Sequence, residues 1–426
     1  MRTRRLITAG AVTALAATFI VGCGSSKSST TPPSGTATSA GSSTSTGSSA
    51  ATGTPIVIGS LGEFSGVQAA SQAGAPLVLD AWVKSVNDAG GIAGHPVKLI
   101  TKDLGNNLTG GLAAVKELIQ SDHVVAIVGE QDNNDTSWAT YAQQSGVPVV
   151  GGATNTIPMM TTPDFFPVGG NLFSLVYGTL ALAKGLGTKF GNLYCAESPQ
   201  CAQSDALYKG LGGVLGVTVP VSRKITATQP SYTSECQALK DSGAQSYIVG
   251  ENSAVVQHVA TECAAAGYTA PTISVDGIMT AGWLKTPALD GALDAEGVAP
   301  WFDTSVPATQ GYQALKAKYL PDLGDKDGPN AFYSYVSGEL FKKAVENAGA
   351  DTVTADTVKQ GLYMMQGETL GGLTPPLTFV KDKPTLVNAF FTVGIKGGKF
   401  VEPNGIKPTA VPDAIVSGIL AQLPKS

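Results

Sequence analysis

Polar, glycine-rich segments recur along the chain, and each comes directly after a short apolar run. They cover residues 59–66, 129–134, 151–155, 195–198, 250–253 and 276–277. Glycine lets backbone N–H groups approach a ligand, and hydroxyl groups or helix N-termini beside it suit a carboxylate or another anion. Any one segment is also what an ordinary turn or helix cap looks like. Their common position after predicted strands indicates a binding site for a small molecule.

Motifs for catalysis are missing from the sequence. It has no G-x-x-x-x-G-K-[ST] phosphate loop, no G-x-S-x-G nucleophile elbow and no H-E-x-x-H zinc motif. None of the three histidines (His95, His123 and His258) is spaced with the cysteines as metal ligands are. We therefore expect no metal, no cofactor and no enzymatic activity. An α/β enzyme is the alternative, and turnover of a bound ligand would support it.

Five cysteines divide into one near the N-terminus and four in the body of the chain. An even number in an exported protein predicts disulfides, and four cysteines allow three pairings. We favour the local pairs. Cys195 and Cys201 lie six residues apart around a Ser-Pro, and Cys236 and Cys263 lie in consecutive predicted helices.

The N-terminal segment predicts an exported protein with a lipid anchor. Three arginines in the first five residues precede an apolar run that is short for a membrane span and ends in Ile-Val-Gly-Cys at Cys23. This ending resembles the bacterial lipoprotein box, in which the signal is cut before a cysteine that receives the lipid. We predict a signal peptide over 1–22 and, over 23–54, the lipidated Cys23 and a disordered Ser/Thr/Gly tether. A plain secretory signal is the alternative.

The composition of the chain limits the kinds of protein that it can be. With 426 residues, 43% of them hydrophobic, the chain can form two or more domains. Its net charge of −5 and the lack of a later basic run argue against nucleic-acid binding. Charged residues make up only 14%, against about a quarter in typical proteins, which suits an exported protein.

Short β-branched runs alternate with helical patterns from residue 55 onward. Strands are predicted at 56–59, 97–100, 124–128, 147–150, 192–194, 217–219, 246–249, 272–275 and 389–395, and helices at 77–89, 112–120, 137–145, 175–186, 232–242, 253–266, 309–319, 331–348 and 355–365. This alternation predicts parallel sheets covered by helices on both faces. The pause at 164–171 and the number of strands predict an α/β fold of two doubly wound lobes. We take the glycine string at 210–213 as a helix end.

Four segments resemble the branched-chain amino acid (leucine/isoleucine/valine) substrate-binding family of ABC importers, which has the type I periplasmic binding fold. They are 56–66, the Asn-Asp-Ala-Gly-Gly-Ile-Ala-Gly string at 87–94, 124–129 and 146–155. The resemblance covers most of residues 55–399. It implies a multi-strand hinge between lobe 1, made of 55–172 and 303–374, and lobe 2, made of 173–302 and 375–426.

The resemblance also implies where a ligand binds. In the family, donors of the first lobe take the carboxylate of an amino acid, as Thr154 and the Gly152 backbone would here, and an acid of the second lobe, here Asp276, takes the ammonium. The predicted ligand-binding residues are Ser65, Asn133, Gly152, Ala153, Thr154, Asn252 and Asp276. Aromatic residues of the family are replaced here, among them by Asn252, which predicts a more polar or larger ligand.

The predicted function is therefore that of a monomeric solute-binding lipoprotein on the outer face of the cytoplasmic membrane. It would capture a small amino-acid-like or amide ligand and deliver it to an ABC permease. The alternative is a ligand-sensing receptor of the same fold that acts through a separate membrane partner.

Overall fold

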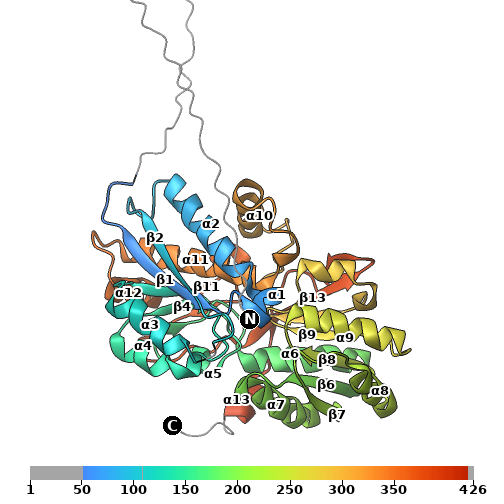
Figure 1. The fold of residues 1–426 in the computed structure, drawn as a ribbon. Coiled ribbons are helices and arrows are strands. Elements are labelled where there is room, and N and C mark those ends of the chain that lie inside the picture. Colours follow the sequence, from blue (N-terminus) through green and yellow to red (C-terminus); the bar gives the residue numbers. More distant parts are fainter. Residues whose placement is uncertain (1–50, 108, 421–426) are drawn as a thin grey trace, which may run out of the picture. The chain divides into compact units, whose positions relative to one another are not determined.

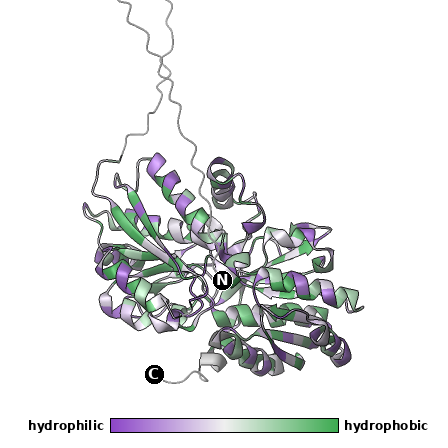
Figure 2. Ribbon diagram, viewed as in Figure 1, coloured by the Kyte–Doolittle hydropathy of each residue, from purple (hydrophilic) through white to green (hydrophobic). Residues whose placement is uncertain are grey.

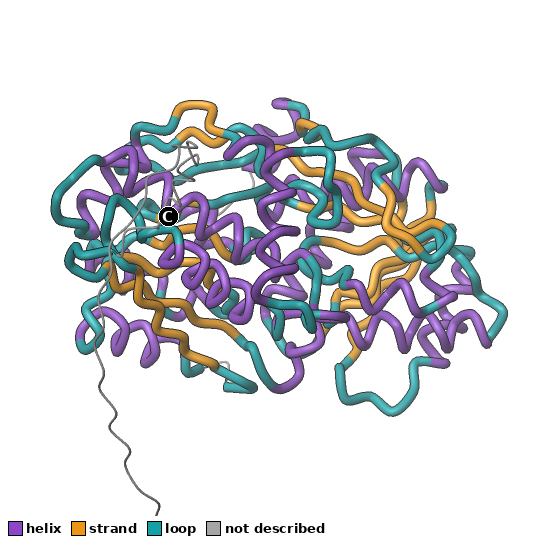
Figure 3. Tube along the Cα trace, turned by 90° about the horizontal axis from the view of Figure 1, so that it is seen from above, coloured by secondary structure: helices purple, strands orange, loops and turns teal. Residues whose placement is uncertain are grey.

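A computed structural model describes residues 51–107 and 109–420, and their strands gather in two groups, each with helices beside it (Figures 1 and 3). The predicted signal peptide, the lipidated Cys23 and most of the predicted tether lie outside the described residues. Within the described ranges, no helix has the length and apolar character that a membrane crossing requires.

The elements follow one another in regular alternation. The strands are β1 (Ile56–Gly62), β2 (Val97–Asp103), β3 (Ala126–Glu130), β4 (Val149–Gly152), β5 (Phe165–Phe166), β6 (Lys189–Cys195), β7 (Thr218–Ile225), β8 (Ser246–Gly250), β9 (Ile273–Val275), β10 (Leu293–Glu296), β11 (Gln366–Glu368), β12 (Leu377–Thr378), β13 (Ala389–Lys396), β14 (Lys399–Val401) and β15 (Thr409–Ala410). The helices are α1 (Ala69–Gln72), α2 (Ala75–Asp88), α3 (Gly111–Gln120), α4 (Ala139–Ser145), α5 (Ile157–Thr161), α6 (Leu172–Leu186), α7 (Pro199–Leu215), α8 (Thr233–Ser242), α9 (Ser253–Ala265), α10 (Pro307–Tyr319), α11 (Pro329–Ala348), α12 (Ala355–Tyr363) and α13 (Asp413–Leu420).

The first lobe is built on a parallel sheet with the strand order β2-β1-β3-β4-β5. Successive side chains of a strand point to opposite faces of the sheet, so each apolar strand contributes side chains to the hydrophobic cores on both faces. Val128 packs in one core with Trp82 of α2 and Leu340 of α11, whereas its neighbour Ile127 packs in the other with Leu118 of α3. The strands accordingly appear hydrophobic along much of their length in Figure 2.

The second lobe has the order β7-β6-β8, continued by a bridge from Tyr247 to Thr272 into β9-β10-β13-β14. The strands from β7 to β10 pair in parallel, as predicted, while β13 and β14 pair antiparallel at the far end of the order. Strands β13 and β14 are joined by a tight turn at Gly397 and Gly398, which have φ of 60° and 66°. Both positions need the left-handed conformation, which glycine adopts easily.

Three chain segments cross between the lobes and hydrogen-bond to one another. The N–H of Gly170 donates to Gly297 O at 3.1 Å, and the N–H of Asn171 donates to Val387 O at 3.0 Å. The two lobes and the multi-strand hinge are thus confirmed. The residue boundaries of the lobes stay a prediction.

Several short elements were not predicted, among them β5, β14 and α13, and two further omissions have a clear physical reason. Helix α7 was not predicted, and the glycine string at 210–213, taken as a helix end, lies inside it. Gly210 and Gly213 have no atoms near where a Cβ would sit, so glycine there costs helix propensity without disturbing the packing. Strand β10 was missed because Asp294 and Glu296, which are buried, break the apolar pattern.

Both predicted disulfides are present. Cys195 at the end of β6 bonds to Cys201 in the first turn of α7, and Cys236 of α8 bonds to Cys263 of α9. The first closes a short loop at the carboxyl end of a strand, and the second fastens two helices over one face of the second lobe's sheet.

Candidate functional site

A cavity of about 150 Å³ lies between the two lobes, beyond the carboxyl ends of their strands. Its polar lining residues include Glu63, Ser71, Gln72, Gln131, Asn133, Asn155 and Asn330 of the first lobe and Asn192, Glu197, Asp205, Glu251, Asn252 and Asp276 of the second. Its larger apolar and aromatic lining residues are Leu172 at the boundary between the lobes and, in the second lobe, Val176, Tyr194, Tyr208, Ile248, Val275 and Ile278.

Four of the seven predicted ligand-binding residues line this cavity, namely Asn133, Ala153, Asn252 and Asp276. Of these, Asn252 also has a structural role. Its Oδ1 accepts hydrogen bonds from the N–H groups of Ala254 and Val255 at 3.1 and 3.2 Å and so caps helix α9.

The other three predicted residues do not line the cavity. Ser65 is exposed, and its N–H donates to Asp103. The N–H of Gly152 donates to Ser337 Oγ at 2.9 Å. Thr154 is fully buried, and its hydroxyl donates to Gly170 O at 2.7 Å. The donors predicted to hold a carboxylate are therefore engaged within the protein.

Asp276 joins the lobes at the back of the cavity. It follows β9 of the second lobe, and its carboxylate accepts the hydroxyl of Tyr333 on α11 of the first lobe. It also accepts the N–H of Gly297 at 3.3 Å, and the oxygen of the Thr154 hydroxyl, whose proton points to Gly170 O, lies 3.5 Å away. Burial raises the pKa of Asp276 to about 6, against the lowering effect of these hydrogen bonds.

Two further contacts join the lobes beside the cavity. The N–H of Ser253 in the second lobe donates to Ser71 Oγ of the first at 2.8 Å. Asn330 Nδ2 donates to Gly277 O of the second lobe at 3.1 Å and to Ser71 O at 3.2 Å. The lobes thus meet directly around the site in this structure.

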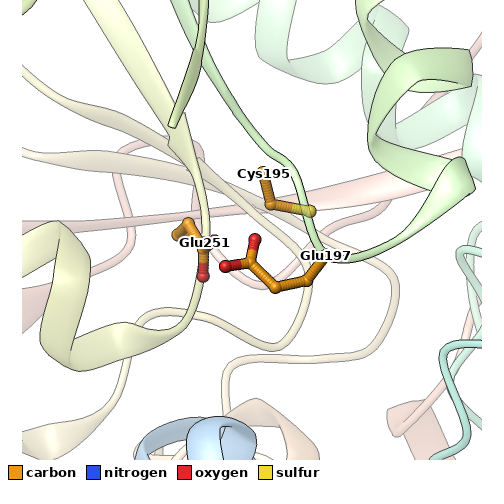
Figure 4. Close-up of side chains that lie close together, drawn as sticks. All are labelled: Cys195, Glu197 and Glu251. Atoms are coloured by element: carbon orange, nitrogen blue, oxygen red, sulfur yellow. The ribbon is translucent and has the colours of Figure 1, made fainter. Parts of the chain in front are cut away.

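Glu197 and Glu251 form a carboxyl pair in the second lobe, with the sulfur of Cys195 beside it (Figure 4). Burial raises the pKa of Glu251 to about 8, as do its hydrogen bond to Glu197 and the charge there. For Glu197, burial is outweighed by hydrogen bonds from Glu251 and the backbone, including the N–H of Ala227, and the pKa is lowered. Near neutral pH the pair therefore shares one proton. Because the Cys195 sulfur is in a disulfide, the three side chains do not offer a thiolate metal site.

Glu63 and Gln131 face the cavity from the first lobe. Glu63 is fully buried and accepts a hydrogen bond from Asn133 through Oε2, while its Oε1 has no partner among the described residues. Gln131 is 1% exposed, and neither of its amide atoms has a partner there. Burial, followed by the charge of Asp132, raises the pKa of Glu63 to about 7.

Four of these residues, Glu63, Gln131, Glu197 and Glu251, were not selected from the sequence. Each lies within two residues of the end of a strand, in a segment that the sequence had marked as polar and glycine-rich. The sequence signal that could have identified these four residues is therefore their position just after a strand. The residues chosen through the resemblance share that position, so the signal alone does not separate the two groups.

Comparisons with known proteins agree with this geometry. A family model described as periplasmic binding protein matches residues 55–399. None of the curated protein sequences compared with the chain matches it. Among solved structures, a branched chain amino acid ABC transporter from Thermus thermophilus with bound valine has a TM-score of 0.77 at 14% identity, covering 86% of this chain and 99% of that one.

Two other solved structures are similar in fold. An extracellular ligand-binding receptor from Verminephrobacter eiseniae has a TM-score of 0.69 at 19% identity, covering 82% of this chain and 99% of that one. A fatty acid ABC transporter substrate-binding protein from Thermomonospora curvata has a TM-score of 0.67 at 17% identity, covering 84% and 95%.

Proposed function

The chain belongs to the periplasmic binding protein family, and from this premise we propose that it is a solute-binding lipoprotein that serves an ABC importer. It captures a small amino-acid-like or amide ligand between its lobes and delivers it to the permease. The observation that carries the proposal is the cavity that both lobes line at the carboxyl ends of their strands.

The similar structures support a binding role without fixing the ligand. One is titled with bound valine and another as a fatty acid binding protein, so the same fold serves ligands of different chemistry. In this chain the cavity combines amide and carboxyl groups with one apolar wall. That lining suits a small molecule with N–H donors and a short apolar body.

The anchoring part of the proposal depends on the sequence alone. A lipid on Cys23 would hold the protein at the outer face of the cytoplasmic membrane. A flexible tether of about thirty residues has a typical span of roughly 30 Å, enough to let the binding lobes reach a permease in the same membrane.

A thermal-shift screen of amino acids, amides, ureas and amines tests the proposed binding role. A ligand present at a hundred times its Kd should stabilise the folded protein by about 2.7 kcal/mol. A compound that raises the unfolding temperature and is recovered chemically unchanged supports binding without turnover. A compound that is converted would support the enzyme alternative.

Asp276 is the residue whose replacement we expect to weaken an α-amino-acid ligand most. Asp276→Asn should reduce affinity by roughly ten- to a hundredfold, because it removes a charged acceptor within the cleft. Calorimetric titration of the compound found in the screen measures the change. The variant Tyr333→Phe removes the hydroxyl that Asp276 accepts but keeps the carboxylate.

The two variants together separate two roles for Asp276. If the carboxylate binds the ligand's ammonium, Tyr333→Phe should cost clearly less than Asp276→Asn. Equal losses would show that Asp276 acts by joining the lobes. Tyr319→Phe is the matched control, because its hydroxyl also donates to an aspartate, Asp88, but on an exposed surface. Wild-type affinity in folded Asp276→Asn would contradict both roles.

A further inference from the structure

We infer that the ligand of the cleft is a small organic cation, an amine or amidine with an apolar body and no carboxylate. This rests on the proposed solute-binding function and assigns its ligand to a different chemical class. It differs from the amino-acid clamp that the resemblance implied, in which first-lobe donors hold an anionic group.

The charge of the lining is the first observation. Among the described residues that line the cavity, five are acidic and none is Lys, Arg or His. One of the five, Asp205, is already paired with Lys209 at 2.7 Å. The remaining carboxyl groups face the cavity without a basic partner, so a cation is attracted and an anion repelled.

Acceptors without partners are the second observation. Oε1 of Glu63 in the first lobe has no hydrogen-bond partner among the described residues. Oε1 of Glu251 in the second lobe has no partner there outside the carboxyl pair with Glu197, and each side chain is at most 4% exposed. The amide oxygen of Gln131 also has no partner there. Buried acceptors are costly unless they are paired, and N–H groups of a ligand held between the lobes would pair them.

The absence of a carboxylate on the ligand follows from the donors. The Gly152 N–H and the Thr154 hydroxyl are committed to Ser337 and Gly170. The Gln131 amide nitrogen is an unpaired donor, but it lies next to an unpaired amide oxygen on the same side chain. This neutral amide donor suits a carbonyl or hydroxyl better than a carboxylate surrounded by acids.

Binding of a cation should be accompanied by proton release from the carboxyl groups of the cleft. Glu251 and Glu63 have pKa values raised to about 8 and about 7, so both bind protons near neutral pH. The charged and titratable groups around them are Glu197 and Tyr232 for Glu251, and Asp132 and Glu130 for Glu63. None of these is basic. A bound cation favours the ionised carboxylates, so binding should release protons, and affinity should fall as the pH is lowered.

Four compounds with similar branched bodies test the charge requirement. They are isoamylamine (a cation), leucine (a zwitterion), isocaproamide (neutral) and isocaproate (an anion). Calorimetric titration of the full chain in buffers of different ionisation enthalpy gives both the affinity and the number of protons released. We expect isoamylamine to bind at least about tenfold more tightly than the other three, with release of roughly one proton.

Each other outcome overturns the inference in a recognisable way. Leucine binding more tightly than isoamylamine would restore the amino-acid site and leave the proposed function standing. Isocaproamide binding as tightly, without proton release, would show a neutral ligand and also leave that function standing. If none of the four binds, the cation inference fails, and the wider thermal-shift screen still decides whether the protein binds any solute.

Two conservative variants test which carboxyl groups of the cleft bind the cation. Glu251→Gln keeps a donor to Glu197 and should lower the affinity for isoamylamine about tenfold and reduce the proton release. Glu63→Gln should act in the same direction from the other lobe. Asp241→Asn, on the exposed surface of α8, is the control and should change neither quantity. Unaltered affinity and proton release in both folded cleft variants would overturn the assignment.

Discussion

Lowering the pH from about 8 to about 5.5 should raise the unfolding temperature of this protein, opposite to the usual acid destabilisation. The cause is a buried acidic cluster beside the hinge, made of Asp276, Asp294 and Glu296. Burial raises the pKa of Asp294 to about 7 and that of Asp276 to about 6, and it raises the pKa of Glu296 well above its usual range.

The sign follows from comparing the folded and unfolded chains. A carboxyl whose pKa is raised by folding stabilises the folded state fully below the unfolded pKa, near 4. That contribution is lost as the pH rises through the folded pKa, here between about 6 and about 7. For Asp294 alone, the rise from 3.8 to about 7 corresponds to at most about 4 kcal/mol of unfolding free energy.

Carboxyls with lowered pKa oppose this trend only weakly. These carboxyls are Asp88, Asp103, Glu197, Asp205 and Glu262, and they are ionised in both the folded and the unfolded chain above pH 5.5, so their contribution changes mainly at lower pH. Asp294→Asn should make the protein more stable at high pH and flatten the pH dependence, whereas Asp241→Asn should leave it unchanged. Thermal unfolding across the pH range measures both. An unfolding temperature that is higher at pH 8 than at pH 5.5 would contradict the expected effect of the cluster.

Removing the disulfide between Cys236 and Cys263 should cost about 3.5 kcal/mol of unfolding free energy in the chain-entropy model. The bond closes a sequence separation of 27 residues and fastens two helices whose cysteines are fully buried. Replacing both cysteines by alanine also leaves a small gap in the core, which adds to the loss. Denaturant unfolding of the double variant measures the change.

The Cys195–Cys201 disulfide provides the matched comparison. Its separation is six residues, so its removal should cost less, about 2.4 kcal/mol. Because both of its cysteines line the cavity, its loss should also weaken ligand binding, which loss of the Cys236–Cys263 bond should not. The prediction is wrong if the short-loop variant proves the less stable of the two, or if only the long-loop variant binds ligand poorly.

Apolar periodicity predicted the alternating strands and helices and the two lobes, whereas the multi-strand hinge was predicted from the family resemblance. Strands such as β3 and β4 begin with apolar runs, and their alternation with helices is visible in the sequence. It failed for β10, where Asp294 and Glu296 occupy buried positions and break the strand pattern. A cluster of buried acids depends on contacts with other elements, such as Tyr333 beside Asp276, which local patterns do not contain.

The candidate site was predicted at the level of segments and only in part at the level of side chains. Position after a strand identified the segments that line the cavity. Whether a polar group in these segments is free to bind a ligand depends on hydrogen-bond partners that are distant in sequence. Gly152 is engaged by Ser337, 185 residues away, whereas Gln131 has no partner among the described residues. Which polar groups have hydrogen-bond partners is therefore known only from the folded structure.

Closure of the two lobes on a ligand is most directly measured by small-angle scattering. The cavity is shared between lobes joined only by a hinge and by contacts such as Ser253 to Ser71, so the free protein should populate an open form. Saturation with the compound that stabilises the protein most in the thermal-shift screen should decrease the radius of gyration. A radius of gyration that stays the same at saturation would contradict binding by closure of the cleft.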